Sequence, residues 1–296
     1  MKKKTLLLTG TTGFIGHKFL LFALSKNFYA IDILRSKNNN NKKIKNLKSL
    51  YPKNYKNIFF SNNKELSKKL KNINADYFIN FATLYSNTHN HSQITNFINS
   101  NILFPTIIYD IINNKIKKMI NFGSMMQHSQ NEKLVSKNFY AATKNAFEMI
   151  CNYYANINNK TKFYNIKFYE SVGDNDNRKK LIPSIIQNYK KNRITKIISK
   201  QLSLNIIHTD DIINSIMVLL NNNVKSGSYC IKNKHNIKIS DLIKFLNNKL
   251  SRKIKVKYLN KSIISNYHNN FRVLPKWKPI KNLENKILKI FQNEIN

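Results

Sequence analysis

Short apolar runs alternate with amphipathic stretches over roughly the first half of the chain. The apolar runs predict β-strands at residues 4–9, 29–34, 58–60, 76–82, 118–122 and 163–168. Apolar residues at helical spacing predict helices directly after residue 16, at about 96–113 and at about 139–157. Strands that alternate with helices are typical of a parallel sheet covered on both faces, so we expect an α/β, doubly wound fold.

Three glycines, three residues apart, follow the first predicted strand. Glycine there permits a tight turn and lets the backbone approach a pyrophosphate. The start of the next helix offers N–H groups and a partial positive charge to the anion. The sequence therefore predicts a dinucleotide-binding turn, with cofactor contacts at Gly10, Thr12, Gly13, Phe14, Ile15 and Gly16.

Tyr140 and Lys144 form a Y-x-x-x-K pattern in the helix predicted at about 139–157. Residues four apart share one face of a helix, so a phenol and an ammonium can point into one site. The Lys cation is expected to lower the pKa of the phenol, which allows proton transfer near neutral pH. Ser124 follows the strand at 118–122, where ligands bind in open α/β sheets. We predict a catalytic group of Ser124, Tyr140 and Lys144.

The glycine turn, read from Thr9 to Gly16 as T-G-T-T-G-F-I-G, resembles the fingerprint of the extended short-chain dehydrogenase/reductases, the nucleotide-sugar epimerase/dehydratase group. The resemblance implies a Rossmann-type doubly wound parallel sheet in a dinucleotide-binding domain at residues 1–165. It implies a smaller C-terminal α/β substrate domain at 166–296, some segments of which return to the first sheet. An NAD(P) cofactor, a nucleoside-diphosphate sugar as substrate and a homodimer are implied as well.

Other segments carry the resemblance further along the chain. Asn80 to Thr83 resembles the family's fourth-strand end, and Asn101 matches a helix residue that supports the active-site lysine. Besides Tyr140 and Lys144, the resemblance implies cofactor contacts at Asn62, Phe81, Ala82, Thr83 and Asn101. It implies substrate contacts at Thr83, Ser124, Met125, His128, Tyr140 and Glu170.

Two departures from the family pattern concern the ligands. Either Asn62 or Ser61 stands at the position where relatives often have an Asp beside adenine. Lys167 and Glu170 replace an Arg and an Asn that relatives use for the substrate, so we expect this chain to hold its sugar differently.

The end of the second predicted strand bears on the choice between NAD(H) and NADP(H). A carboxylate there binds the adenosine ribose 2′-OH, whereas an arginine accommodates a 2′-phosphate. Leu34 occupies the usual acidic position, Arg35 and Ser36 follow it, and Asp32 lies two positions earlier. The sequence favours NADP(H) over NAD(H), with Arg35 and Ser36 as contacts.

The two residues after Ser124 reduce the number of reactions that this site is expected to catalyse. Relatives that eliminate water carry an acidic pair there, and one class of epimerising relatives needs a Cys, but this chain has Met125 and Met126. Neither can transfer a proton, which leaves hydride transfer with Tyr140 as the proton donor. By resemblance we expect reduction of the C4 keto group of a nucleoside-diphosphate 4-keto-6-deoxy sugar in surface-polysaccharide sugar biosynthesis. The alternatives are an NAD-dependent nucleotide-sugar 4-epimerase and a non-catalytic relative that binds RNA or senses redox state.

The charge of the chain changes this picture little. There are 51 Lys and Arg against 14 Asp and Glu, a formal net charge of +37, which by itself would suggest nucleic acid. Lys and Asn are spread along the whole chain, as compositional drift at surface positions would produce. We expect no nucleic-acid partner, no membrane insertion and a cytoplasmic location. Two cysteines exclude a disulfide scaffold, and His89 and His91 lack a third ligand, so no metal is expected.

Overall fold

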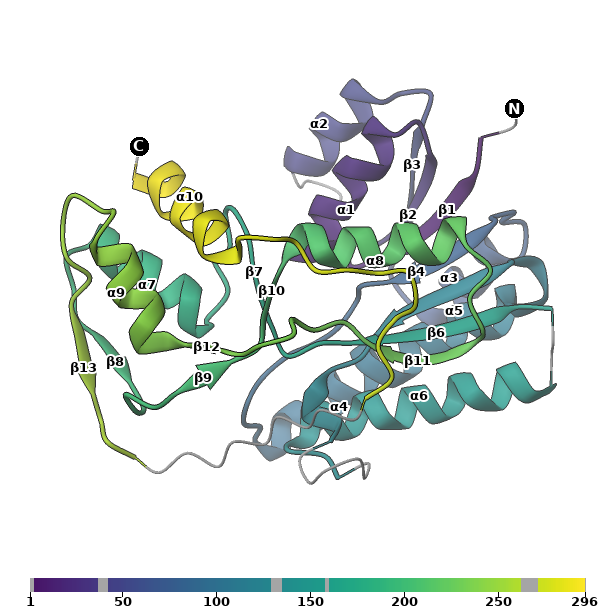
Figure 1. Ribbon diagram of the computed structural model, residues 1–296. Helices are drawn as coiled ribbons and strands as arrows, with labels where there is room; N and C mark the ends of the chain where they lie inside the picture. The colour runs from purple at the N-terminus through teal and green to yellow at the C-terminus, as the bar shows by residue number, and fades with distance from the viewer. Residues whose placement is uncertain (1–2, 37–41, 129–134, 158–159, 262–270, 296) are drawn as a thin grey trace. The chain divides into compact units, whose positions relative to one another are not determined.

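The chain folds into two compact units in a computed structural model that describes residues 3–36, 42–128, 135–157, 160–261 and 271–295 (Figure 1). The first unit comprises Met1–Lys167 with Asn223–Tyr229, and the second comprises Phe168–Asn222 with Cys230–Asn296. No helix among the described residues is long and apolar enough to cross a bilayer.

The first unit is built on a seven-stranded sheet in the order β11-β6-β5-β4-β1-β2-β3. The strands are β1 (Thr5–Thr9), β2 (Tyr29–Arg35), β3 (Tyr55–Phe60), β4 (Tyr77–Asn80), β5 (Lys118–Phe122), β6 (Lys162–Lys167) and β11 (Gly227–Cys230). All pairings from β3 through β6 are parallel, which confirms the predicted α/β, doubly wound fold. The strand order changes direction between β1 and β4, the place where open sheets of this kind bind ligands.

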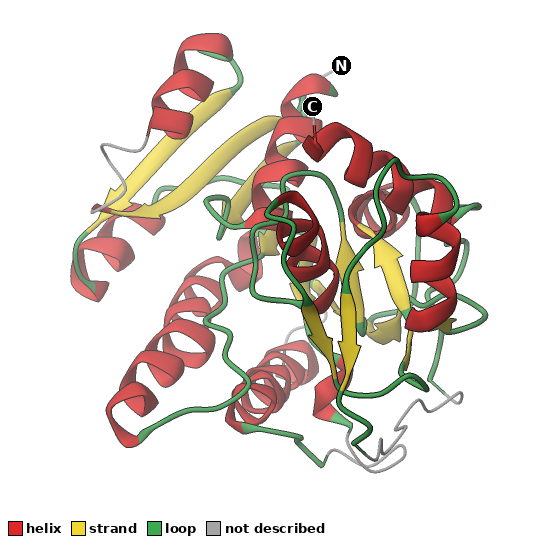
Figure 2. Ribbon diagram, turned by 90° about the vertical axis from the view of Figure 1, so that its left-hand side faces the viewer, coloured by secondary structure: helices red, strands yellow, loops and turns green. Residues whose placement is uncertain are grey.

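Helices cover both faces of this sheet. They are α1 (Phe14–Ser25), α2 (Lys42–Leu50), α3 (Asn63–Leu70), α4 (Ile94–Ile98), α5 (Phe104–Ile112) and α6 (Phe139–Ile157), with short 3₁₀ turns η2 (His91–Gln93), η4 (Asn113–Lys115) and η5 (Met125–Gln127). In Figure 1, α1 and α2 lie at the top of the view and α6 at the bottom, and Figure 2 shows the yellow strands between red helices. The helix predicted at about 96–113 is divided, because a π-helical turn η3 (Asn99–Leu103) separates α4 from α5.

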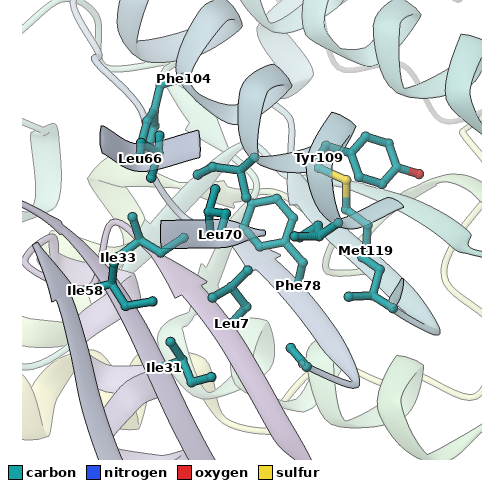
Figure 3. Packing of buried hydrophobic residues seen from close by; sticks show 14 of the residues in the cluster. Leu7, Ile31, Ile33, Ile58, Leu66, Leu70, Phe78, Phe104, Tyr109 and Met119 are labelled. Atoms are coloured by element: carbon teal, nitrogen blue, oxygen red, sulfur yellow. The ribbon is translucent and has the colours of Figure 1, made fainter. Parts of the chain in front are cut away.

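An apolar cluster of the first unit lies between the sheet and helices α3, α5 and α6 (Figure 3). Leu7, Phe78 and Met119 reach it from three neighbouring strands, and each is fully buried. Leu6 and Leu8 are buried as well and point to the opposite face, because side chains alternate along a strand. Each such residue contributes about 1.5–3 kcal/mol by leaving water.

A buried row of polar side chains links the strand ends beneath the predicted site. Thr9 Oγ1 donates to Asn80 Oδ1 at 2.6 Å, Asn80 Nδ2 to Asn121 Oδ1 at 2.9 Å, and Asn121 Nδ2 to Asn165 Oδ1 at 2.9 Å. Buried polar groups are costly unless they are paired. This row therefore helps to fix the register of β1, β4, β5 and β6 near their carboxyl ends.

The second unit is smaller and has its own core. Its strands are β7 (Glu170–Val172), β8 (Thr195–Ile197), β9 (Ser203–Leu204), β10 (Ile206–His208), β12 (Ile237–Lys238) and β13 (Val256–Tyr258), joined as β10-β7, β12-β9 and β13-β8 pairs. Its helices are α7 (Leu181–Lys190), α8 (Thr209–Asn221), α9 (Ile239–Asn247) and α10 (Leu283–Ile295). Ile197, Leu242 and Ile287 are among its buried residues. Trp277 is also buried in this unit and donates to Asp211 O at 2.9 Å.

Candidate active site

The glycine turn joins β1 to α1 and leaves no room for side chains at two of its positions. Gly10 has φ +70°, and a Cβ there would lie 2.4 Å from Ala82 N. A Cβ at Gly16 would lie 2.4 Å from Gly10 O. The turn therefore packs backbone to backbone against the end of β4, as a turn that admits a pyrophosphate requires.

The start of α1 suits an anion. Its N-cap is Gly13, which has no side chain to satisfy the helix's first N–H groups, and no acidic residue lies in the first turn. Gly13 N donates to Gly10 O at 3.0 Å, which holds the turn closed at the base of the helix. The residues predicted to contact a dinucleotide here thus fit one.

Asp32, on β2, is hydrogen-bonded to this turn through Thr11. Its Oδ2 accepts hydrogen bonds from Thr11 Oγ1 at 2.6 Å and Tyr55 OH at 2.8 Å. Burial raises the pKa of the Asp32 carboxyl to about 6, although both hydrogen bonds act in the opposite direction. Its carboxylate is therefore engaged within the protein, and the carboxyl end of β2 carries Arg35 and Ser36 instead.

Arg35 and Ser36 lie exposed at that strand end. Arg35 Nη2 donates to Ser100 Oγ at 3.2 Å, and the Ser36 and Ser61 hydroxyls are 2.9 Å apart. Asn62 has a structural role that its neighbours explain, because its side chain accepts from Glu65 N and caps α3. A guanidinium and hydroxyls at this edge could hold a 2′-phosphate.

Tyr140 and Lys144 lie one turn apart on α6, and both are buried. Burial raises the pKa of Tyr140, Tyr85 adds to the rise, and a hydrogen bond with Thr83 opposes it. The expectation that Lys144 lowers this pKa is not met, because the loss of solvent dominates. Tyr140 is therefore a neutral phenol, which suits a proton donor.

Lys144 is affected by the same surroundings. Burial lowers the pKa of its ammonium to about 8, and Cys151 opposes this slightly. Near neutral pH the side chain still carries most of its charge in a low-dielectric site, where a charge exerts a larger effect than in water.

Ser124 is held against α6 by the short turn η5. Its Oγ accepts from Met126 N at 3.2 Å, and its backbone N–H donates to Gln127 Oε1 at 2.8 Å. Gln127 Nε2 in turn donates to Asn145 Oδ1 at 2.6 Å, on the residue after Lys144. The structure thereby joins the turn that carries Ser124 to the helix that carries the predicted catalytic pair.

Asn101 lies in the π-helical turn and is buried. Its Nδ2 donates to Thr143 Oγ1 at 2.9 Å and to Leu84 O at 3.0 Å, and its Oδ1 accepts from Leu84 N at 2.6 Å and Thr83 Oγ1 at 3.2 Å. Asn101 thus connects the segment after β4 to α6 through Thr143, next to Lys144. Local π-helical turns often mark functional sites.

Phe81 and Ala82 form the wall beside the glycine turn. The Phe81 ring stacks on Phe122 with centroids 5.0 Å apart and packs against Phe19 at 5.4 Å. Ala82 N is the atom that a side chain at Gly10 would strike. This segment fixes the turn relative to β4 and β5.

The other predicted substrate contacts lie in different places. Met125 and His128 are buried in the first unit, and His128 Nε2 lies 2.9 Å from Lys167 Nζ. Glu170 belongs to the second unit, where Lys180 pairs with it at 3.0 Å. No metal-binding group of His, Cys, Asp and Glu occurs within the part of the chain that the structure describes.

Several residues at the site have no signal in the sequence. Tyr85 packs edge-on against Tyr140, with ring centroids 4.9 Å apart. Gln127 and Glu148 form a buried polar group behind Ser124 together with Lys167, which the sequence marked only as a departure from the family pattern. Single polar residues in a chain this rich in Tyr, Lys and Asn do not stand out until the fold brings them together.

The fold is of Rossmann type, and the turn between β1 and α1 has the geometry that a dinucleotide-binding turn requires. The chain belongs to the NAD dependent epimerase/dehydratase family, whose sequence model matches residues 6–231. CDP-abequose synthase from Yersinia pseudotuberculosis is 29% identical over 162 residues, which are 54% of this chain and 56% of that protein. The chain thus aligns with about half the length of this curated relative.

Solved structures resemble nearly the whole chain. UDP-N-acetylglucosamine 4-epimerase from Methanobrevibacter ruminantium M1 has a TM-score of 0.79 at 19% identity, covering 99% of this chain and 98% of that one. UDP-glucuronic acid 4-epimerase from Bacillus cereus, solved with NAD, has a TM-score of 0.77 at 18% identity, and the match covers 99% of this chain and 100% of that one. dTDP-glucose 4,6-dehydratase from Bacillus anthracis str. Ames, also solved with NAD, has a TM-score of 0.76 at 17% identity, and the match covers 98% of this chain and 96% of that one. At these identities the likeness shows the fold alone.

Proposed function

We propose that this protein is an NADP(H)-dependent reductase of the C4 keto group of a nucleoside-diphosphate 4-keto-6-deoxy sugar. The observation that carries the proposal is the attachment of the Ser124 turn to α6 directly beside Lys144, through the Gln127–Asn145 hydrogen bond. The sequence similarity to CDP-abequose synthase supports the same substrate class. Such a reduction would serve surface-polysaccharide sugar biosynthesis in the cytoplasm.

The glycine turn, the start of α1 and the segment Phe81–Thr83 would hold the dinucleotide, with Asn101, Tyr140 and Lys144 beside them. Arg35 and Ser36 would hold the 2′-phosphate, because Asp32 is engaged with Thr11 and Tyr55. When bound, the cofactor supplies hydride to the carbonyl carbon of the sugar. Asn62 remains a proposed contact near adenine.

Tyr140 would protonate the oxygen of the sugar carbonyl as that oxygen becomes an alkoxide. A raised pKa keeps its phenol protonated, which a donor requires before the reaction begins. Lys144 would stabilise the phenolate that remains after transfer, because its ammonium is one helical turn away. The Ser124 Oγ accepts from Met126 N and so retains its own proton to donate to the carbonyl oxygen.

The surroundings of Ser124 support reduction over elimination. Met125 and Met126 form η5 with Gln127, and neither thioether can carry a proton. A dehydratase would need an acid and a base at this place. We propose that the sugar nucleotide contacts Thr83, Met125, His128 and Glu170.

A homodimer is proposed on one feature of α6. Ala142, Ala146, Met149, Tyr153 and Ile157 form an exposed stripe along one face of this helix. Met149, Tyr153 and Ile157 are 58%, 58% and 61% exposed. A second copy of the chain is the occupant that we propose for this stripe, because α6 also carries the catalytic pair and family resemblance implies pairing there.

Replacement of Tyr140 tests the function most simply. We expect Tyr140→Phe to lower the turnover of a 4-keto sugar nucleotide by about 100-fold or more, since it removes the proton donor and retains the ring. NADPH binding, measured by fluorescence titration, should stay close to that of the native protein. Tyr154→Phe on the same helix is the matched control, because its hydroxyl bonds Asp110 and has no role in the reaction. Full turnover by Tyr140→Phe would overturn the assignment.

The in-family alternative, an NAD-dependent 4-epimerase, predicts a different result. Such an enzyme would be purified with NAD bound and would interconvert sugar nucleotides without net consumption of NADPH. A non-catalytic RNA-binding relative would show salt-sensitive RNA binding and no affinity for NADP(H).

A further inference from the structure

The side chain of Gln127 uses both ends of its amide in the buried space behind Ser124. The Oε1 atom accepts from Ser124 N at 2.8 Å, and Nε2 donates to Glu148 Oε2 at 2.7 Å as well as to Asn145. Gln127 is fully buried. It therefore connects the backbone of Ser124 to a carboxylate on α6 with a single side chain.

The carboxylate of Glu148 is itself fixed from two strands. Lys167 Nζ on β6 lies 2.9 Å from its Oε2, and Ser228 on β11 donates to its Oε1. Burial would raise the pKa of Glu148, but Lys167 and the hydrogen bonds from Ser228 and Gln127 outweigh it and hold the pKa below the usual value. Glu148 is thus a charged side chain whose two carboxylate oxygens both have partners.

Gly123 gives an independent sign that the position of Gln127 matters to the strand end. A Cβ at Gly123 would lie 2.5 Å from Gln127 Oε1 and 2.9 Å from Asn165 Nδ2. Gly123 N also donates to Ile166 O at 2.9 Å, which keeps β5 paired with β6 up to the residue before Ser124. The amide can reach the Ser124 backbone only because residue 123 lacks a side chain.

We propose that Gln127 is a positioning residue, which fixes the height and direction of the Ser124 hydroxyl by linking its backbone to the Glu148–Lys167 pair. The inference rests on the proposed reductase function. A hydroxyl that must meet a carbonyl oxygen loses much of its effect when it moves by a fraction of an ångström, because hydrogen bonds depend steeply on distance and angle. Gln127 itself touches neither the substrate nor the cofactor in this proposal.

A double-mutant cycle separates this role from simple packing. We expect Gln127→Leu to lower kcat by about 10- to 100-fold with the Kd of NADPH unchanged. In a Ser124→Ala background, the same replacement should lower the remaining kcat by less than about 2-fold, because no hydroxyl is left to position. Gln93→Leu is the matched control, because Gln93 makes the same capping-box contact at the exposed turn η2.

Gln127→Glu supplies a second readout, and also serves if Gln127→Leu fails to fold. A protonated Glu can accept from Ser124 N and donate to Glu148 as the amide does, whereas an ionised one is repelled by Glu148. Its kcat should therefore recover as the pH falls, relative to that of the native protein measured in parallel. Lys167, His128 and the buried Cys151 are the other charged or titratable groups that the described residues place against this cluster.

The possible failures are distinguishable. An equal loss from Gln127→Leu in the native and Ser124→Ala backgrounds, or a pH-independent ratio for Gln127→Glu, would reduce Gln127 to a packing residue. Native turnover in Ser124→Ala, or no NADPH oxidation with any sugar nucleotide, would instead remove the proposed function and this inference with it.

Discussion

Buried ionisable side chains are the main residue-scale feature of this site. Asp32, Tyr140 and Lys144 are all nearly inaccessible, and loss of solvent is the largest cause of each pKa shift. The sequence correctly placed Tyr140 and Lys144 on one helix. It could not give the sign of the Tyr140 shift, because that depends on burial, which a four-residue spacing does not reveal.

Asp32 gives a pH-dependent prediction. Its pKa is raised from 3.8 to about 6, so the folded protein holds this proton more tightly than the unfolded chain does. The bound proton makes its full contribution to the free energy of unfolding below pH 3.8. That contribution is lost as the pH rises through 6. An amide in place of this carboxyl would not titrate. We expect the free energy of unfolding of Asp32→Asn, relative to that of the native protein, to rise by up to about 3 kcal/mol between pH 4 and pH 8.

Urea unfolding across that pH range measures the difference. Thr11→Val should enlarge the native pH dependence, because the hydrogen bond from Thr11 lowers the pKa of Asp32. A free-energy difference between Asp32→Asn and the native protein that stays constant from pH 4 to 8 would contradict the account.

At the scale of elements, α6 is the part on which the site depends. The sequence predicted this helix at 139–157 and β5 at 118–122 with the observed ends. Strong periodicity and clear polar boundaries made these elements predictable. The π-helical turn that divides the helix predicted at about 96–113 has no signal in the local periodicity. Its Asn101 bonds Thr143 and Leu84, which are distant in the sequence.

The Glu148–Lys167 pair could not be predicted for a related reason. The two residues are 19 positions apart, and only the packing of α6 against β6 brings them into a buried contact. Removal of one partner of a buried ion pair leaves the other charge uncompensated, whereas removal of both can be nearly neutral.

We therefore expect Glu148→Leu to destabilise the protein by about 3–5 kcal/mol, and addition of Lys167→Met to restore most of that loss. Urea unfolding of the two variants measures both steps. The double variant should regain stability without regaining full kcat, because Gln127 has lost its anchor. A single variant within about 1 kcal/mol of the native protein would show that the pair does not hold α6 in place.

At the scale of the whole molecule, the sequence anticipated a Rossmann-type sheet followed by a smaller α/β part. Residues 223–229 return to the first unit, and β11 joins the sheet beside β6. The boundary drawn at 165 and the role of the later part in holding substrate remain proposals. Neither follows from strand patterns, because the short strands of the second unit are two or three residues long.

The proposed dimer is testable at this scale. We expect a Met149→Glu, Tyr153→Glu double variant to be monomeric by light scattering at concentrations where the native protein is dimeric, since two charges would interrupt the exposed apolar stripe of α6. Leu50→Glu is the matched control, because Leu50 is 70% exposed on α2. A native protein that is already monomeric would remove the dimer and leave the reductase proposal intact.

The central claim is net hydride transfer to a 4-keto sugar nucleotide, and NADPH oxidation measures it most directly. The purified protein should be given NADPH or NADH with CDP-, dTDP-, GDP- and UDP-linked 4-keto-6-deoxy sugars, and the consumption of each cofactor followed by absorbance. We predict that at least one of these sugars drives stoichiometric oxidation, faster with NADPH than with NADH. If no sugar consumes either cofactor while the protein carries tightly bound NAD, the reductase account is wrong.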